Sequence, residues 1–261
     1  MTTPRYRPTP VDISLSTAIA SACLLAAVGF GTWLGRSLPA ESLSPESKNT
    51  VTLAMGMVAT MAALLLGLLV NSAKTAYDTT RGQVMQKASK YALLDRVLAI
   101  YGPPGAEVRG KLHAVIEAET RRLWPAPADI PVQSKHDERM GNALYVALLR
   151  LEARDDAERA LKAQAVSLAL ELGGLVALME AESTTSIPKP MLSVVTLWLM
   201  IIFIGFSVIA PPNSAAICAL IASASCSAGA IYLLLDLHRP FEGLMRVSSE
   251  PMKDVLRQLG T

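Results

Sequence analysis

The sequence is poor in charge for its length. Charged residues make up 18% of the 261 residues, aromatic residues make up 5%, and the formal net charge is only +2. Nucleic-acid-binding proteins carry clusters of lysine and arginine, often with interleaved aromatic side chains, and the sequence has no such cluster. We therefore expect no nucleic acid among the partners of this protein.

Cysteine and histidine are also scarce, with three residues of each. Cys23, Cys218 and Cys226 lie in apolar runs, without metal-ligand spacing or a disulfide framework, so we expect buried thiols that act as small hydrophobic side chains. The sequence contains no His-Glu-x-x-His, no Cys-x-x-Cys, no phosphate-cradling glycine loop and no nucleophile elbow. We therefore expect no catalytic residue, no cofactor and no metal, and we do not expect an enzyme.

Hydrophobic residues, in contrast, make up 51% of the chain, and the mean hydropathy is +0.37. Four uncharged runs reach the roughly 20 residues that a helix needs to cross a bilayer, at 13–34, 51–73, 191–210 and 214–235. Pro211, Pro212 and Asn213 break the last two runs into a membrane hairpin. The sequence therefore predicts an all-α membrane protein with four transmembrane helices. The apolar stretch of the first run is longer than that of a typical signal peptide, so we expect it to stay in the protein as a helix rather than to be cleaved after Ala40.

The region between the second and third runs has the composition of soluble helices, and no strand pattern competes. We predict that the second transmembrane helix continues without a break to Ile100 and stops at the Gly-Pro-Pro-Gly sequence of residues 102–105. A helix over 106–123, a proline-rich loop over 124–133, and one long helix over 137–183 follow, with a possible bend at Gly173-Gly174. Residues 250–259 are expected to form a short amphipathic helix on the membrane or on the soluble bundle.

Apolar residues at spacings of three and four predict the buried faces of these helices. They are Val84, Ala88, Tyr91, Leu94, Val97, Leu98 and Tyr101 on the first helix, Val108, Leu112, Val115 and Ile116 on the second, and Leu148, Leu151, Leu161, Ala165, Leu168, Leu172, Leu175 and Leu178 on the third. Paired acids such as Asp155-Asp156 and Glu117/Glu119 are interpreted as solvated helix faces.

Four spans place both termini and the soluble region on one side of the membrane. Basic residues gather on that side, whereas the opposite loop balances Arg36 and Lys48 with Glu41 and Glu46, so the positive-inside rule predicts a cytoplasmic location. We expect a multi-pass protein of the inner (cytoplasmic) membrane. Its predicted parts are a cytoplasmic N-terminus (1–12), transmembrane helices 1 and 2 (13–73), a cytoplasmic helical domain (74–190), transmembrane helices 3 and 4 (191–237), and a cytoplasmic tail (238–261).

The most informative polar residues follow the apolar runs. Asn71, Ser72 and Lys74 end the second run, and Asp236 ends the fourth. They are consistent with ordinary membrane-interface residues, and equally with a wet vestibule at the mouth of a pore. The second run also carries small residues at helical spacing, which suit either close helix packing or a narrow pore: Ala54, Gly56, Ala59, Ala62, Ala63 and Gly67.

Three stretches, "LLLGLLVNSAKTAYD", "LLDRVLAIYGP" and "YLLLDLHRPFEGLMRVSSEP", resemble the bacterial bestrophin-like membrane protein family over about residues 17–259. That family is similar in turn to true bestrophins, which are pentameric channels, chiefly for chloride in animals, with a related bacterial member that passes cations. The resemblance implies a pore lined by the second transmembrane helix. "TAYD" at 75–78, with Tyr77 and Asp78, is similar to the stretch that continues the bestrophin pore helix. Asp236, Pro240 and Phe241 are similar to the segment after the last bestrophin span.

The sequence also departs from the bestrophin pattern. If "TAYD" sets the register, the positions of the bulky hydrophobic neck fall near Ala63, Gly67 and Asn71, which are small or polar. A register shifted by one or two residues brings in Leu66 or Val70. The acidic calcium clasp of animal bestrophins is absent, since only Glu242 follows Pro240-Phe241, so calcium gating is not expected.

The sequence and the resemblance together predict an oligomeric ion-conducting or anion-permeable channel, a homopentamer, with the lipid bilayer and inorganic ions as its partners. The expected pore-lining residues are Ala59, Ala63, Leu66, Gly67, Val70, Asn71 and Lys74. A ring of unpaired Lys74 side chains would attract anions, whereas pairing with Asp78 would cancel that effect. The alternative is a non-conducting membrane scaffold whose cytoplasmic helical bundle binds a partner.

Overall fold

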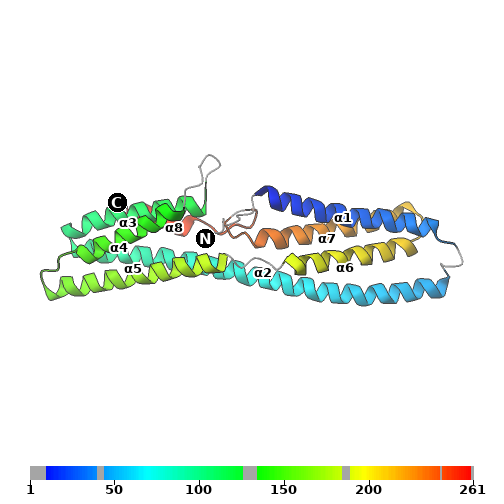
Figure 1. The fold of residues 1–261 in the computed structure, drawn as a ribbon, viewed down its shortest axis with the longest axis horizontal. Coiled ribbons are helices and arrows are strands. Elements are labelled where there is room, and N and C mark those ends of the chain that lie inside the picture. The colour runs from blue at the N-terminus through cyan, green and yellow to red at the C-terminus, as the bar shows by residue number, and fades with distance from the viewer. Residues whose placement is uncertain (1–9, 40–43, 126–133, 184–188, 242, 260–261) are drawn as a thin grey trace, which may run out of the picture. The chain divides into compact units, whose positions relative to one another are not determined.

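The computed structural model describes residues 10–39, 44–125, 134–183, 189–241 and 243–259, and every regular element within these ranges is a helix (Figure 1). The chain divides into two compact units. Unit 1 comprises Met1–Ala76 and Ile187–Arg239, and unit 2 comprises Tyr77–Ser186 and Pro240–Thr261. The helices are α1 (Pro10–Ser37), α2 (Pro45–Tyr101), α3 (Pro103–Leu123), α4 (Ser134–Arg150), α5 (Asp156–Ser183), α6 (Lys189–Ile209), α7 (Ser214–Leu237) and α8 (Glu250–Leu259).

Helix α2 is the long continuous helix that the sequence predicted. It runs for 57 residues, and the polar residues Asn71, Ser72 and Lys74 do not interrupt it. Within this stretch the Thr75 hydroxyl donates back to the Asn71 carbonyl oxygen at 2.9 Å, as threonine commonly does inside a helix. The helix ends at Tyr101; the next residue, Gly102, has a φ of 88° in the left-handed region, and Pro103 begins α3 directly afterwards.

In unit 1, α1 packs against both α6 and α7 (Figure 1). Two glycines on α1 allow a close approach to α6: a Cβ atom added at Gly31 would lie 2.7 Å from the Ile204 carbonyl oxygen, and one at Gly35 would lie 2.7 Å from that of Val208. Small residues let transmembrane helices pack backbone to backbone in this way. The Asn213 side chain accepts a hydrogen bond from the Ala216 N–H at 2.8 Å and so begins α7 after the predicted proline turn.

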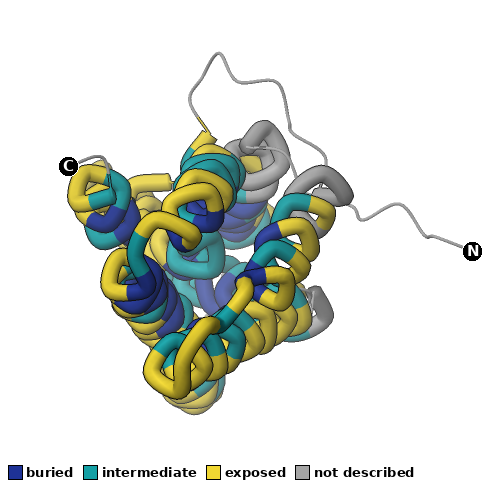
Figure 2. Tube along the Cα trace, turned by 90° about the vertical axis from the view of Figure 1, so that its left-hand side faces the viewer, coloured by how far each residue is buried: buried dark blue, intermediate teal, exposed yellow. Residues whose placement is uncertain are grey.

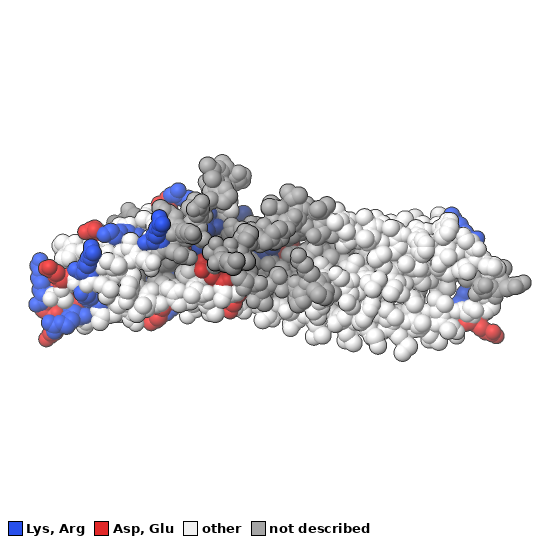
Figure 3. All heavy atoms as spheres, viewed as in Figure 1, with Lys and Arg blue, Asp and Glu red and all other residues white. Residues whose placement is uncertain are grey.

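Five described helical segments are long and apolar enough to cross a membrane: Thr17–Ser37, Pro45–Tyr101, Asp156–Glu182, Met191–Ile209 and Ser214–Leu237. Four of them overlap the predicted spans. The additional segment belongs to α5, which the sequence assigned to the cytoplasmic part, so the count of four spans stays a prediction. On the face drawn in Figure 3, unit 1 has a broad uncharged surface with charged side chains only at its right-hand end, whereas lysine, arginine and acidic side chains are spread over unit 2.

Unit 2 is a helical bundle whose core matches most of the predicted apolar faces. All seven predicted core residues of α2, from Val84 to Tyr101, are buried. In Figure 2 the buried residues, in dark blue, lie on the sides of helices that face other helices, and the exposed residues, in yellow, lie on the outer sides. Met252 and Val255 of α8 are buried in this core, and α8 contacts α3. The tail helix therefore packs on the bundle, which decides between the two locations expected for it.

The prediction of one long helix over 137–183 is wrong. The chain leaves helical geometry after Arg150 and begins α5 at Asp156. The reason is local: the Asp155 carboxylate accepts the Glu158 N–H, and the Glu158 carboxylate accepts the Arg154 N–H, both at 2.7 Å. This arrangement is a helix N-terminus. α5 continues through Gly173-Gly174.

Two expectations about burial are also wrong. Leu178 is 48% exposed, because its position on α5 falls outside the face that packs into the core. Cys218 and Cys226 are exposed and Cys23 is partly buried, because α7 turns both of its cysteines away from α1 and α6 within the single chain. Most of the predicted loop over 124–133 lies outside the described residues, as do residues 184–188 before α6.

Candidate functional site

The unit 1 part of α2 has one face that packs against the other helices. Ala62, Leu69 and Ala73 are buried there with residues of α1, α6 and α7. Leu65 and Leu66 are partly buried against the same core. These positions recur every three or four residues, so they form one side of the helix and leave the rest of its circumference uncovered in the single chain.

The predicted pore-lining residues lie mainly on a second, exposed face. Ala63, Gly67, Val70, Asn71 and Lys74 are exposed. At 100° per residue they occupy one side of α2, and we call this side, extended by Gly56 and Thr60, the small-residue face. The two other predicted residues, Ala59 and Leu66, are partly buried against the unit 1 core and so lie at its edge.

Packing within the described chain does not explain why the glycines of this face are so small. A Cβ atom added at Gly56 or Gly67 would meet no atom within 4 Å, whereas one added at Gly31 would collide with α6. The close-packing glycines described in unit 1 are therefore on α1 and α6, where a Cβ atom added at Gly205 would collide with the Met55 side chain. Of the small residues on α2, Ala62 packs closely, and the glycines do not.

A third face of α2 is exposed and bulky, and it lies beside the small-residue face. Its members are large apolar side chains, between 55% and 68% exposed: Leu53, Met57, Met61, Leu64 and Leu68. Such a stripe suits hydrocarbon or another protein surface, and it is a costly surface to present to water. Three kinds of side chain thus lie on three different sides of α2: a packed face, a bulky apolar face and the small-residue face.

The small-residue face carries a charged side chain, Lys74, at its C-terminal end. Lys74 and Asp78 are both exposed and lie one helical turn apart, and no ion pair joins them in the described part of the chain. The Ser72 side chain is exposed as well, and it points toward the bulky face by its position in the helical repeat.

The residues predicted to be structural at the membrane edge have defined surroundings. Tyr77 is partly buried against the core of unit 2, and Asp236 is buried in unit 1. The Pro240 carbonyl oxygen accepts the Val247 N–H at 2.6 Å. The Phe241 ring meets Trp124 edge to face, with ring centroids 5.3 Å apart.

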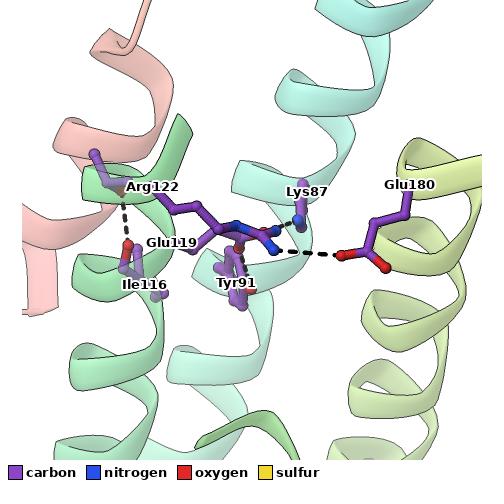
Figure 4. A network of polar contacts seen from close by, with 7 residues as sticks. Lys87, Tyr91, Ile116, Glu119, Arg122 and Glu180 are labelled. Carbon is purple, nitrogen blue, oxygen red and sulfur yellow. Dashed lines mark hydrogen bonds and ion pairs between the residues drawn. The ribbon is translucent and has the colours of Figure 1, made fainter. Parts of the chain in front are cut away.

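Unit 2 contains a buried polar network that the sequence analysis missed (Figure 4). The carboxylate of Glu119 on α3 accepts hydrogen bonds from Lys87 and Tyr91 of α2, the latter at 2.7 Å. All three residues are at least nine-tenths buried. Interpreting Glu117 and Glu119 alike as solvated was wrong for Glu119, because Glu119 follows the buried positions Leu112 and Ile116 around α3.

The network reaches α5 through two further contacts. Arg122 of α3 lies 3.8 Å from Glu119 and 3.3 Å from Glu180 of α5. Gln83, one turn before Lys87 on α2, donates to the Glu182 carboxylate at 2.7 Å. Burial, together with the nearby Glu119 carboxylate, raises the pKa of the Tyr91 phenol well above its usual value. The network therefore links α2, α3 and α5 with groups that carry both signs of charge.

A sequence signal for this network exists. Lys87 falls among the buried positions Val84, Ala88 and Tyr91, and a lysine on a buried face requires an acidic partner. The partner could not be identified from the sequence, because several glutamates of the following helices were equally available. Within the described residues, no group of three or more histidine, cysteine, aspartate or glutamate side chains is placed to hold a metal ion.

Comparison with known proteins gives a consistent result. The family model for a Bestrophin-like domain matches residues 22–252. The fold is similar to a solved variant of a bacterial Bestrophin homolog from Klebsiella pneumoniae, with a TM-score of 0.65, 13% sequence identity and 97% of both chains covered. A second variant of that homolog gives a TM-score of 0.64 at 14% identity, covering 95% of this chain and 97% of the other. No curated protein matches the chain.

Proposed function

The chain belongs to the Bestrophin-like family, and from this we propose that it is an ion channel whose pore is lined by the small-residue face of α2. The resemblance to bestrophins supports conduction as the function, with inorganic ions as the transported species. The proposed assembly is a homopentamer in the inner membrane, crossed by α1, the first part of α2, α6 and α7. Both termini and the soluble bundle are assigned to the cytoplasm.

The observation that carries this proposal is the separation of side chains around α2. A pore-lining helix needs one face toward its own subunit, one toward lipid or a neighbouring subunit, and one that leaves an open axial space. Ala63, Gly67 and Asn71 supply the third kind of surface, and no described residue of the chain lies within 4 Å of a Cβ atom added at Gly67.

Anion permeability is proposed from Lys74. In a pentamer the five exposed ammonium groups would raise the local anion concentration at one end of the small-residue face. The absence of an ion pair between Lys74 and Asp78 in the described chain supports this assignment, because a paired lysine would contribute much less field.

The test is a planar-bilayer recording of the purified protein in a salt gradient. For the natural sequence we expect a reversal potential near the equilibrium potential of the anion. For Lys74→Glu we expect the reversal potential to shift toward the equilibrium potential of the cation. Lys253→Glu is the matched control, because Lys253 is an exposed cation on α8 and should leave selectivity unchanged. Identical reversal potentials for the natural sequence and Lys74→Glu would remove the role of Lys74.

The alternative of a non-conducting scaffold makes different predictions. It requires no current from the purified protein and no axial opening along α2. The mass of the detergent-solubilised particle tests the assembly: five subunits would support the channel, and a monomer or dimer would contradict it.

A further inference from the structure

The first loop after α7 exposes two large apolar side chains side by side. Leu244 is 76% exposed, the largest value of any large apolar residue described, and Met245 is 48% exposed. Gly243 and Arg246, their neighbours on either side, are exposed as well. We call residues 243–246 the loop tip.

The base of this loop is firmly held. Val247 is buried, its N–H donates to the Pro240 carbonyl oxygen at 2.6 Å, and its own carbonyl oxygen accepts the Trp124 indole N–H at 2.8 Å. Phe241 packs edge to face on the same indole. Gly243 makes the reversal with a φ of 89°. The loop tip is therefore displayed by an ordered base, so the exposure of Leu244 does not come from a lack of local structure.

The loop tip lies close in the chain to a membrane span. α7, one of the apolar helices long enough to cross a bilayer, ends at Leu237. Leu244 lies seven positions after Leu237, so its backbone is at most about 25 Å of extended chain from the end of the span. The hydrogen bond between Pro240 and Val247 closes the loop and brings its base within three residues of α7.

The chemistry of this segment fits a lipid headgroup layer. Arg246 is exposed and cationic, and residues 239–246 carry a net charge of +1. Arginine pairs with anionic headgroups, and a leucine–methionine pair buries its apolar surface at the boundary between headgroups and acyl chains. We propose that the loop tip inserts into the headgroup layer of an anionic bilayer and anchors the start of the C-terminal tail there.

The test uses the full chain with Cys23, Cys218 and Cys226 replaced by alanine and a single cysteine introduced at Leu244→Cys. A fluorophore on that cysteine is reconstituted in vesicles of phosphatidylglycerol and phosphatidylcholine that contain a lipid-borne quencher. Met245→Cys provides a second labelled position in case the first alters the loop. Glu107→Cys is the reference for a side chain in water, because Glu107 is exposed on α3, outside the segments apolar enough to cross a membrane.

We expect quenching by the lipid-borne group to be roughly twofold or more stronger at 244 or 245 than at 107, and access of an aqueous quencher to be correspondingly weaker. Arg246→Gln should reduce this contrast in vesicles rich in phosphatidylglycerol. Lipid quenching no stronger than at 107 would overturn the proposal, whether the loop tip then proves open to water or covered by a second copy of the chain. This result does not depend on whether the protein conducts ions, so it is separate from the test of the proposed channel.

Discussion

Lys87 on α2 and Glu119 on α3 form an ion pair in the interior of unit 2, where 1% and 7% of their side chains are exposed. Removing two charges from water is unfavourable, and the pair persists only because further groups satisfy the carboxylate. Tyr91 donates to its second oxygen at 2.7 Å, and Arg122 lies 3.8 Å away. Removing one partner of this pair should therefore lower the stability of the fold much more than removing an ordinary surface contact.

The first prediction concerns Glu119→Gln. The substitution keeps the shape of the side chain but leaves the Lys87 ammonium buried without an opposite charge beside it. We therefore expect the free energy of unfolding to fall by about 3 kcal/mol. The measurement is the thermal or denaturant unfolding of the purified protein in detergent. Glu117→Gln is the control, because Glu117 makes an exposed pair with Arg121 and should change stability by less than about 0.5 kcal/mol. Equal effects of the two variants would contradict a buried role for Glu119.

The second prediction is a loss of stability at alkaline pH that depends on Tyr91. Burial and the neighbouring Glu119 carboxylate raise the pKa of the Tyr91 phenol in the folded state. A raised pKa means that the contribution of Tyr91 is fully present below the ordinary tyrosine pKa and is lost as the pH rises beyond it. Unfolding measured between pH 8 and pH 11 should therefore show a steeper decline for the natural sequence than for Tyr91→Phe. Parallel declines would show that Tyr91 does not titrate differently in the folded state.

The helices of the fold were predictable because local signals agreed with tertiary packing. The uncharged runs, the Gly-Pro-Pro-Gly stop and the apolar positions from Val84 to Tyr101 gave helices whose observed ends differ by a few residues. The missed break before α5 had a signal as well, since Asp155 followed by Glu158 has the spacing of a helix N-terminus. It was missed because leucines on both sides of the break continue the same helical period.

The candidate site was less predictable, because its residues depend on what surrounds them. The sequence places Ala63, Gly67, Asn71 and Lys74 on one helix face, but only the packing of α1, α6 and α7 shows that this face stays uncovered in the chain. The partners of Lys87 depend on how α3 and α5 lie beside α2, and no local pattern encodes that arrangement.

The third prediction separates the packing glycines from the exposed ones. A methyl group at Gly31 would lie 2.6 Å from Ser207 Cβ and 2.7 Å from the Ile204 carbonyl oxygen, so Gly31→Ala must push α1 away from α6. We expect a loss of about 1–3 kcal/mol, measured as a lower melting temperature in detergent. Gly56→Ala, where no atom lies within 4 Å of the new methyl group, should be neutral or slightly stabilising. The reverse order would contradict the close α1–α6 contact.

The fourth prediction concerns the start of α5. Asp155→Ala removes the carboxylate that accepts the Glu158 N–H, and loss of such a cap typically costs about 1 kcal/mol. The adjacent Asp156→Ala removes only an exposed pair with Arg159 and should have a smaller effect on unfolding. If both variants unfold alike, Asp155 does not cap α5.

The last prediction tests which face of α2 borders the proposed pore. Gly67→Met adds a long side chain to the small-residue face, and the single chain has room for it because no atom lies within 4 Å of a Cβ atom at this position. In a pentamer the five added side chains would converge on the axis, and we expect single-channel conductance to fall by roughly half or more. Leu68→Met is the matched control, because the neighbouring Leu68 lies on the bulky face, is 62% exposed and already carries a side chain of similar volume. Its conductance should equal that of the natural sequence. Unchanged conductance for Gly67→Met would contradict the assignment of the small-residue face to the pore axis.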